Sequence, residues 1–172
     1  RPEWYDANNA LVGQGASMVT ACALWSHAGM LAQLLDRDGE YALLASTRSL
    51  WTELDDALHH YEFAAVTKEP QTRRRFTDAV GRAGENHRRR IYERDFGPAA
   101  RVSGARIRAF LHEARDLLAT SIRANRRADG LYHGYNLVTF EGDDRITVRR
   151  LDLMLEAQAA VLGSGFVDGP AS

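Results

Sequence analysis

The segment that decides the fold runs from residue 103 to residue 122 and reads SGARIRAFLHEARDLLATSI. Its apolar residues recur every three or four positions, which is the spacing of one face of an α-helix. This stripe comprises Ile107, Phe110, Leu111, Ala114, Leu117, Leu118 and Ile122. We therefore predict a long helix that begins at Ser103 and buries one face against neighbouring helices.

Four further segments have helical character, and one has the character of strands. The helices are expected from about Gln14 to Asp36, from Ser46 or Thr47 through Tyr61, from Pro70 to about Arg94, and from about Thr147 to Gly163. Residues 137–140 and 145–148 flank the sequence EGDD and predict a short β-hairpin. Long helices joined by short loops run antiparallel to their neighbours. The sequence thus predicts an all-α antiparallel α-hairpin array, as a bundle or an arc of an α/α toroid, with one small β-hairpin.

The alternation of helix directions predicts which loops share an end of the array. The segment before the first helix, the 67–71 loop and the 129–146 loop should lie at one end, and the loops around Asp38 and Phe96 at the other. The two loops richest in polar and aromatic groups would then converge. We expect Trp4 and Asp6 to lie near Tyr132, His133, Tyr135 and Asn136.

Length and composition suit one domain with a hydrophobic core. We expect a single helical domain over residues 1–164, as a fragment of a larger protein whose remainder packs against it, and a flexible tail over residues 165–172. No apolar run is long enough to span a bilayer and no signal peptide is evident, so we expect no membrane partner and a cytoplasmic location. The only cysteine, Cys22, is expected to be buried.

Charge is unevenly distributed, although the net charge is only −1. Residues 67–127 are rich in arginine and include the triplets 73–75 and 88–90, whereas both flanking segments are acidic. We interpret the arginines as a solvated face that pairs with the acidic segments. Nucleic-acid binding is disfavoured because only Phe76 and Tyr92 interleave the arginines. The six histidines lack metal-ligand spacing, so we expect no metal.

The N-terminal loop carries the chemistry of a saccharide site. Residues 3–9 read EWYDANN and combine two carboxylates, an indole, a phenol and two carboxamides. An aromatic face can stack on a sugar ring, amides can bridge hydroxyls, and a carboxyl can protonate a glycosidic oxygen. The alternative is structural, with the polar residues capping backbone amides and Trp4 sealing the core.

This loop, with the Val12-Gly13 and Gly15 that follow it, resembles the Asp-Trp-Asn-Asp-Gly-Met-Asn loop of cellobiose phosphorylases. These are helical-toroid glycoside phosphorylases, so the resemblance implies a toroid fold and Asp6 as general acid. It also implies saccharide contacts by Trp4 and Asn9, and inorganic phosphate as a co-substrate without any other cofactor. Residues 129–136 and 154–158 further resemble segments of very long, uncharacterised bacterial proteins of glycosidase-like helical type.

Residues 129–136, DGLYHGYN, are the second candidate for substrate contact. A hydrolase would also need a second carboxylate, for which Glu69, Asp129 and Glu141 are candidates. We thus expect a carbohydrate-active module that cleaves an oligosaccharide or glycoside by phosphorolysis or hydrolysis. The alternative is a non-catalytic helical interaction or scaffold domain. The expected substrate contacts are Trp4, Asn9, Tyr132, His133, Tyr135 and Asn136, with Asp6 catalytic.

Overall fold

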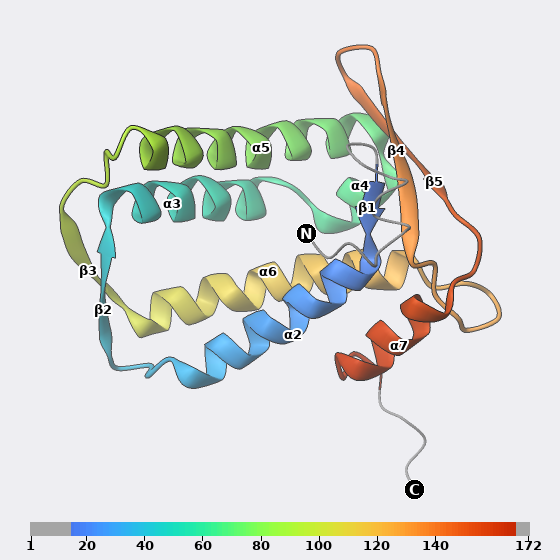
Figure 1. Cartoon of the computed structure of the whole chain (residues 1–172), viewed down its shortest axis with the longest axis horizontal. Helices are drawn as coiled ribbons and strands as arrows, with labels where there is room; N and C mark the ends of the chain where they lie inside the picture. The colour runs from blue at the N-terminus through green and yellow to red at the C-terminus, as the bar shows by residue number, and fades with distance from the viewer. Residues whose placement is uncertain (1–14, 168–172) are drawn as a thin grey trace, which may run out of the picture.

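The computed structural model describes residues 15–167. Four long helices lie side by side, with α3 next to α5 and α2 next to α6, and strands stand at both ends of the helices (Figure 1). The elements in chain order are β1 (Gly15–Ser17), α2 (Met18–Leu34), β2 (Glu40–Leu44), α3 (Ala45–His60), α4 (Phe63–Lys68), α5 (Pro70–Tyr92), β3 (Ala99–Ser103), α6 (Gly104–Ala124), β4 (Tyr135–Glu141), β5 (Arg145–Arg150) and α7 (Leu155–Gly163). No helix in this range is long and apolar enough to cross a membrane.

The prediction of an all-α toroid segment is wrong, because the fold is a mixture of helices and strands. Two antiparallel sheets are present, one with the strand order β1-β4-β5 and the other made of β2 and β3. Strands β1, β2 and β3 have three to five residues each, and their partners lie far away in the sequence. A periodicity of two cannot be recognised in such short segments, so only the pairing of distant residues defines them.

The hairpin and the four long helices are confirmed, with changes at two boundaries. Gly15–Ser17 form β1 instead of the start of the first helix, which begins at Met18. Val138 pairs with Val148, and the ladder continues from there to Asn136 and Arg150. Residues up to Arg150 therefore belong to β5, and the last helix begins at Leu155 instead of near Thr147. The short helix α4 was not predicted.

The prediction of which loops lie at the same end of the helices is confirmed for the described residues. At one end, β2 pairs with β3 over Glu40–Leu44 and Ala99–Ser103, and Ser46 N–H donates to the Phe96 carbonyl at 3.0 Å. At the other end, β1 pairs with β4, with Ser17 opposite Tyr135. The β1–β4 pairing joins the start of the described chain to the 129–136 loop.

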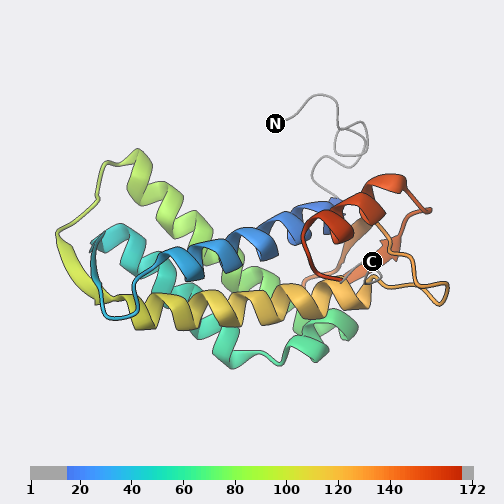
Figure 2. The same ribbon diagram turned by 90° about the horizontal axis from the view of Figure 1, so that it is seen from below.

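The main hydrophobic core lies where α2, α6 and α7 meet. The Ser17 hydroxyl caps α2 by accepting from Thr20 N–H at 3.1 Å, which fixes the direction in which α2 leaves the sheet. Burial raises the pKa of the Cys22 thiol, so the thiol stays protonated. Helix α7 packs against α2 (Figure 2). The buried residues of this core are Met18, Cys22, Ile122, Tyr132, Ala157 and Val161.

The contact between α3 and its neighbours is more polar. Trp51 packs edge-on against Phe110 of α6, with ring centroids 6.2 Å apart, and Arg106 lies 5.2 Å from the Trp51 ring centroid. Asn86 of α5 donates to the Glu53 carboxylate at 3.1 Å. Side-chain hydrogen bonds thus hold α5 on α3 in addition to apolar packing.

Candidate functional site

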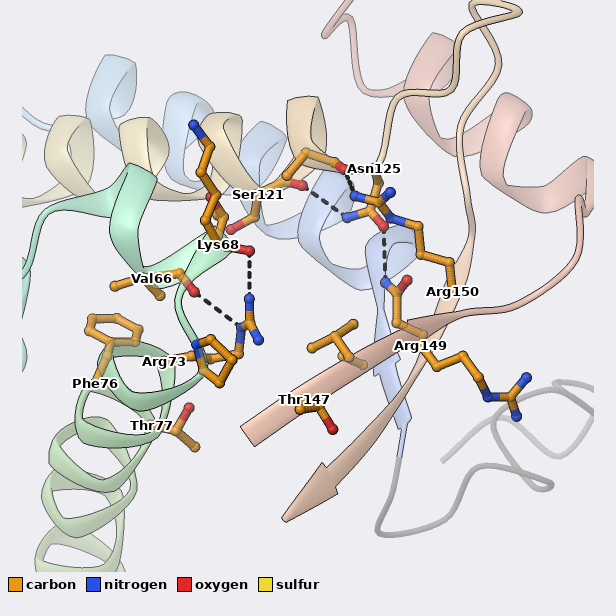
Figure 3. Close-up of a pocket in the computed structure, with 16 residues that line it drawn as sticks. Val66, Lys68, Arg73, Phe76, Thr77, Ser121, Asn125, Thr147, Arg149 and Arg150 are labelled. Atoms are coloured by element: carbon orange, nitrogen blue, oxygen red, sulfur yellow. Dashed lines mark hydrogen bonds between the residues drawn. The ribbon is translucent and has the colours of Figure 1, made fainter. Parts of the chain in front are cut away.

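A cleft of the described structure lies between the α4–α5 corner and the β1-β4-β5 sheet, with the last turn of α6 at its upper edge (Figure 3). Its volume is about 820 Å³, within the range of about 300–1,000 Å³ that is usual for ligand pockets. Six elements contribute to its walls, so the cleft forms only when the sheet and the helices have assembled.

Arg73 builds the wall on the helical side. Helix α4 ends at Lys68, and Pro70 starts α5 directly afterwards, as is favourable at a first helical position. Three N–H groups of Arg73 then donate to backbone carbonyls of Val66, Thr67 and Ile146, the last at 2.8 Å. The guanidinium thereby satisfies carbonyls at the end of α4 and connects α4 to β5.

A chain of amides builds the wall on the sheet side. Asn125 donates to the Ser121 carbonyl at 2.9 Å, and Asn136 donates from Nδ2 to Asn125 Oδ1 at 3.0 Å. Asn136 is only 5% exposed, and its Oδ1 has no hydrogen-bond partner among the described residues. Arg150 donates to the Ala124 carbonyl and closes the exposed end of α6. The wall therefore includes one buried acceptor whose bonding capacity is unused.

The lining is strongly cationic. Lys68, Arg73, Arg149 and Arg150 line the cleft, and no Asp or Glu of residues 15–167 does. Burial lowers the pKa of Arg73, because desolvation disfavours the charged form, yet arginine remains protonated at neutral pH. The cleft thus carries positive charge that no carboxylate of its described lining compensates.

Arginines elsewhere on α5 behave differently. Arg74 pairs with Asp78 at 2.8 Å, Arg90 pairs with Asp95 at 3.1 Å, and Arg88 pairs with Glu85. Three arginines of the two triplets thus form ion pairs within or just beyond α5, whereas the prediction paired the arginines with the acidic flanking segments.

The predicted contact residues of the 129–136 loop separate into two groups. Asn136 lines the cleft, but Tyr132 lies in the main core and Tyr135 is 1% exposed. His133 is half-buried, and its Nδ1 lies 3.0 Å from the Leu151 carbonyl oxygen. Tyr132 and Tyr135 therefore pack inside the protein in this conformation instead of presenting their rings to the cleft. Trp4, Asp6 and Asn9 lie outside the described residues.

The candidate second carboxylates all have partners of their own. Glu69 accepts from the Thr72 hydroxyl at 2.7 Å, and Glu141 accepts from Thr147 at 2.7 Å. Asp129 forms an ion pair with Arg127, and the hydrogen bond from that guanidinium lowers the pKa of Asp129. None of the three lines the cleft.

A separate cluster of titratable groups lies between α3 and α6. Ligand atoms of Asp55, His59 and Glu113 lie within 4.8 Å of one another, although no metal-ligand spacing was recognised in the sequence. Glu113 comes from a different helix, which is why spacing along the chain could not reveal the cluster. His59 Nε2 lies 3.3 Å from Glu113 Oε1, and Nδ1 lies 2.9 Å from the Asp55 carbonyl oxygen. An ion pair of protonated His59 accounts for this geometry.

Replacing Glu113 by glutamine should lower the pKa of His59. The hydrogen bond to the Asp55 carbonyl and the charge of Glu113 both raise this pKa above its usual value, and the substitution removes the second cause. Because the pKa is raised in the folded state, the stabilisation from protonation is fully present below the unfolded-state pKa and is lost as pH rises through the folded-state pKa. An NMR titration of the His59 ring protons measures the shift, and an unchanged titration would contradict this account.

No protein-family model matches this chain, and no curated protein matches it.

Proposed function

We propose that the chain is a carbohydrate-active module that cleaves glycosidic bonds, with Asp6 as general acid and the cleft as part of the saccharide site. The observation that carries the proposal is the pairing of β1 with β4. Through it Ala16 and Asn136 line the same cleft, and the segment that contains the saccharide-type loop joins the described structure at Gly15, beside that cleft. Asp6 lies ten positions before Ala16 in the sequence, and an extended chain of that length spans up to about 35 Å.

The chemistry follows from the residue types. The Asp6 carboxyl would donate its proton to the glycosidic oxygen as the bond from that oxygen to the anomeric carbon breaks. Water or phosphate would form the new bond to the anomeric carbon. Trp4 offers an apolar face for a sugar ring, and Asn9, Asn125 and Asn136 offer amides for its hydroxyls.

Replacing Asp6 by asparagine tests the proposal. Asparagine cannot donate the proton, so turnover should fall by about 10²–10⁴-fold while affinity for the saccharide is unchanged. The assay uses the full-length protein and a panel of disaccharides starting with cellobiose, with and without inorganic phosphate, and measures reducing sugar and sugar phosphate. The Asp38→Asn variant, an exposed acid at the opposite end of the helices, is the control. Full activity of the Asp6 variant would remove Asp6 from the mechanism.

A second candidate function, a helical interaction domain, is supported by the outer faces of α2 and α7. Leu34 is 72% exposed and Leu155 is 81% exposed, and Leu24, Met30 and Leu162 are exposed as well. A helix that is apolar on most sides is usually covered by other protein. The remainder of a longer parent chain would be a suitable partner. For the compartment we propose the cytoplasm, where an unpaired cysteine such as Cys22 is usual.

A further inference from the structure

The cationic side chains of the cleft fall into two groups, those that are bonded to the backbone and those that are not. Arg73 and Arg150 are fixed by hydrogen bonds to backbone carbonyls, so their positions are set by the fold. Lys68 and Arg149 are exposed, stand on opposite sides of the cleft and extend away from its centre (Figure 3). Neither side chain makes a hydrogen bond or ion pair with any residue of 15–167. Two rim cations are therefore available to a ligand, and two fixed cations keep the interior positive.

No carboxylate among the described lining residues compensates this positive charge. Glu69 lies between the lining residues Lys68 and Pro70 in the sequence, but its carboxylate accepts a hydrogen bond from Thr72 and does not line the cleft. By contrast, Arg74 and Arg90 of α5 form ion pairs with Asp78 and Asp95. A cleft lined by one sign of charge concentrates ligands of the opposite sign. A ligand that carries negative charge would complement these cations.

The cleft also has features that a simple anion would not use. Its volume of about 820 Å³ suits a ligand of several rings, and its cations stand on both walls instead of meeting at one point. The amides of Asn125 and Asn136 line it, and Asn136 keeps one buried oxygen without a partner in the described structure. Amide groups are suited to hydroxyl groups, because they can both donate and accept hydrogen bonds.

The geometry points to an acidic oligosaccharide as the ligand, that is, a saccharide that carries its own carboxylate or phosphate groups. Lys68 and Arg149 would contact oxyanions at the rim, Arg73 and Arg150 would provide the positive field, and the amide chain would face hydroxyls. This inference rests on the proposed saccharide function and narrows its substrate class. The same oxyanion chemistry could come from free phosphate beside a neutral sugar, and the experiment separates the two sources.

The test measures binding to the 172-residue chain by calorimetry. The probes are trigalacturonate, its fully methyl-esterified form, inorganic phosphate and a single-stranded oligonucleotide. We expect trigalacturonate to bind at least about tenfold more tightly than the neutral ester, with an affinity that falls as salt is added. The double variant Lys68→Gln/Arg149→Gln should lose about tenfold of that affinity.

The control is Arg37→Gln/Arg82→Gln, which removes two positive charges from exposed side chains outside the cleft. It should bind trigalacturonate like the wild type, and circular dichroism should show that both double variants are folded. Equal affinity for acid and ester, an unaffected cleft variant, or tighter binding of phosphate or oligonucleotide than of trigalacturonate would each overturn the inference. A turnover loss in Asp6→Asn together with equal affinity for acid and ester would keep the proposed function and reject only the acidic substrate. Charge-dependent trigalacturonate binding together with full activity of Asp6→Asn would keep the acidic ligand of the cleft and reject Asp6 as the general acid.

Discussion

Replacing Gly104 by alanine is expected to destabilise the protein by about 3 kcal/mol or more, because the site has no room for a methyl group. A Cβ built on Gly104 would lie 1.9 Å from the Asp36 carbonyl oxygen and 3.1 Å from a ring carbon of Tyr41. The backbone is held there by the hydrogen bond from Gly104 N–H to the Gly39 carbonyl at 2.8 Å. The clash is therefore with backbone, and relief would require opening the end of the fold where β2 and β3 pair. Urea unfolding monitored by circular dichroism measures the effect.

Gly84→Ala is the matched control. Gly84 lies inside α5 and a Cβ there would meet nothing within 4 Å. Alanine favours a helix over glycine by about 1 kcal/mol, so this variant should be more stable than the wild type. Similar destabilisation by both substitutions would show that close packing at Gly104 is not the cause.

Replacing Arg73 by alanine is expected to cost about 3 kcal/mol of unfolding free energy. The guanidinium satisfies carbonyls of Val66, Thr67 and Ile146, and hydrogen bonds from charged groups contribute about 1.5–3 kcal/mol when their partners would otherwise be unsatisfied. Water can reach part of this half-buried site, so the three bonds do not add in full. Urea unfolding measures the loss.

Two further variants define the cause of the Arg73 effect. Arg73→Lys keeps the charge but cannot reach three acceptors with one planar group, so it should recover only part of the stability. Arg75→Ala removes an exposed neighbouring arginine and should change stability by less than about 0.5 kcal/mol. An equal loss in Arg75→Ala, or full recovery in Arg73→Lys, would contradict a role for the three-carbonyl geometry.

The sequence predicted those parts of the fold whose signals are local. The apolar stripe from Ile107 to Ile122 identified α6, and EGDD between two β-rich runs identified the hairpin. Strands β2 and β3 were missed because their pairing joins Tyr41 to Val102, which only tertiary structure brings together. The predicted start of α7 was wrong for a similar reason. Residues up to Arg150 pair with β4, and this pairing between strands, which local sequence does not show, moves the start of the helix to Leu155.

The candidate site was predictable only in part. Asn136 was identified because it belongs to a polar and aromatic loop, whereas Tyr132 of the same loop lies in the core. Sequence cannot distinguish an aromatic ring that packs inside from one that faces a ligand. Arg73 was grouped with Arg74 and Arg75 as a solvated face, yet its side chain turns inward to α4 and β5. Its role depends on acceptors from other elements, one of which is 73 residues away.

The brevity of β1 has a consequence for motion. Gly15, Ala16 and Ser17 form an edge strand whose pairing with β4 spans three residue pairs. Edge segments with so few bonds open at a small fraction of the global unfolding free energy. Detachment of this strand would remove Ala16 from the wall of the cleft while the helices stay folded. Fraying of this short edge strand would thus widen the cleft on one side without unfolding of the domain.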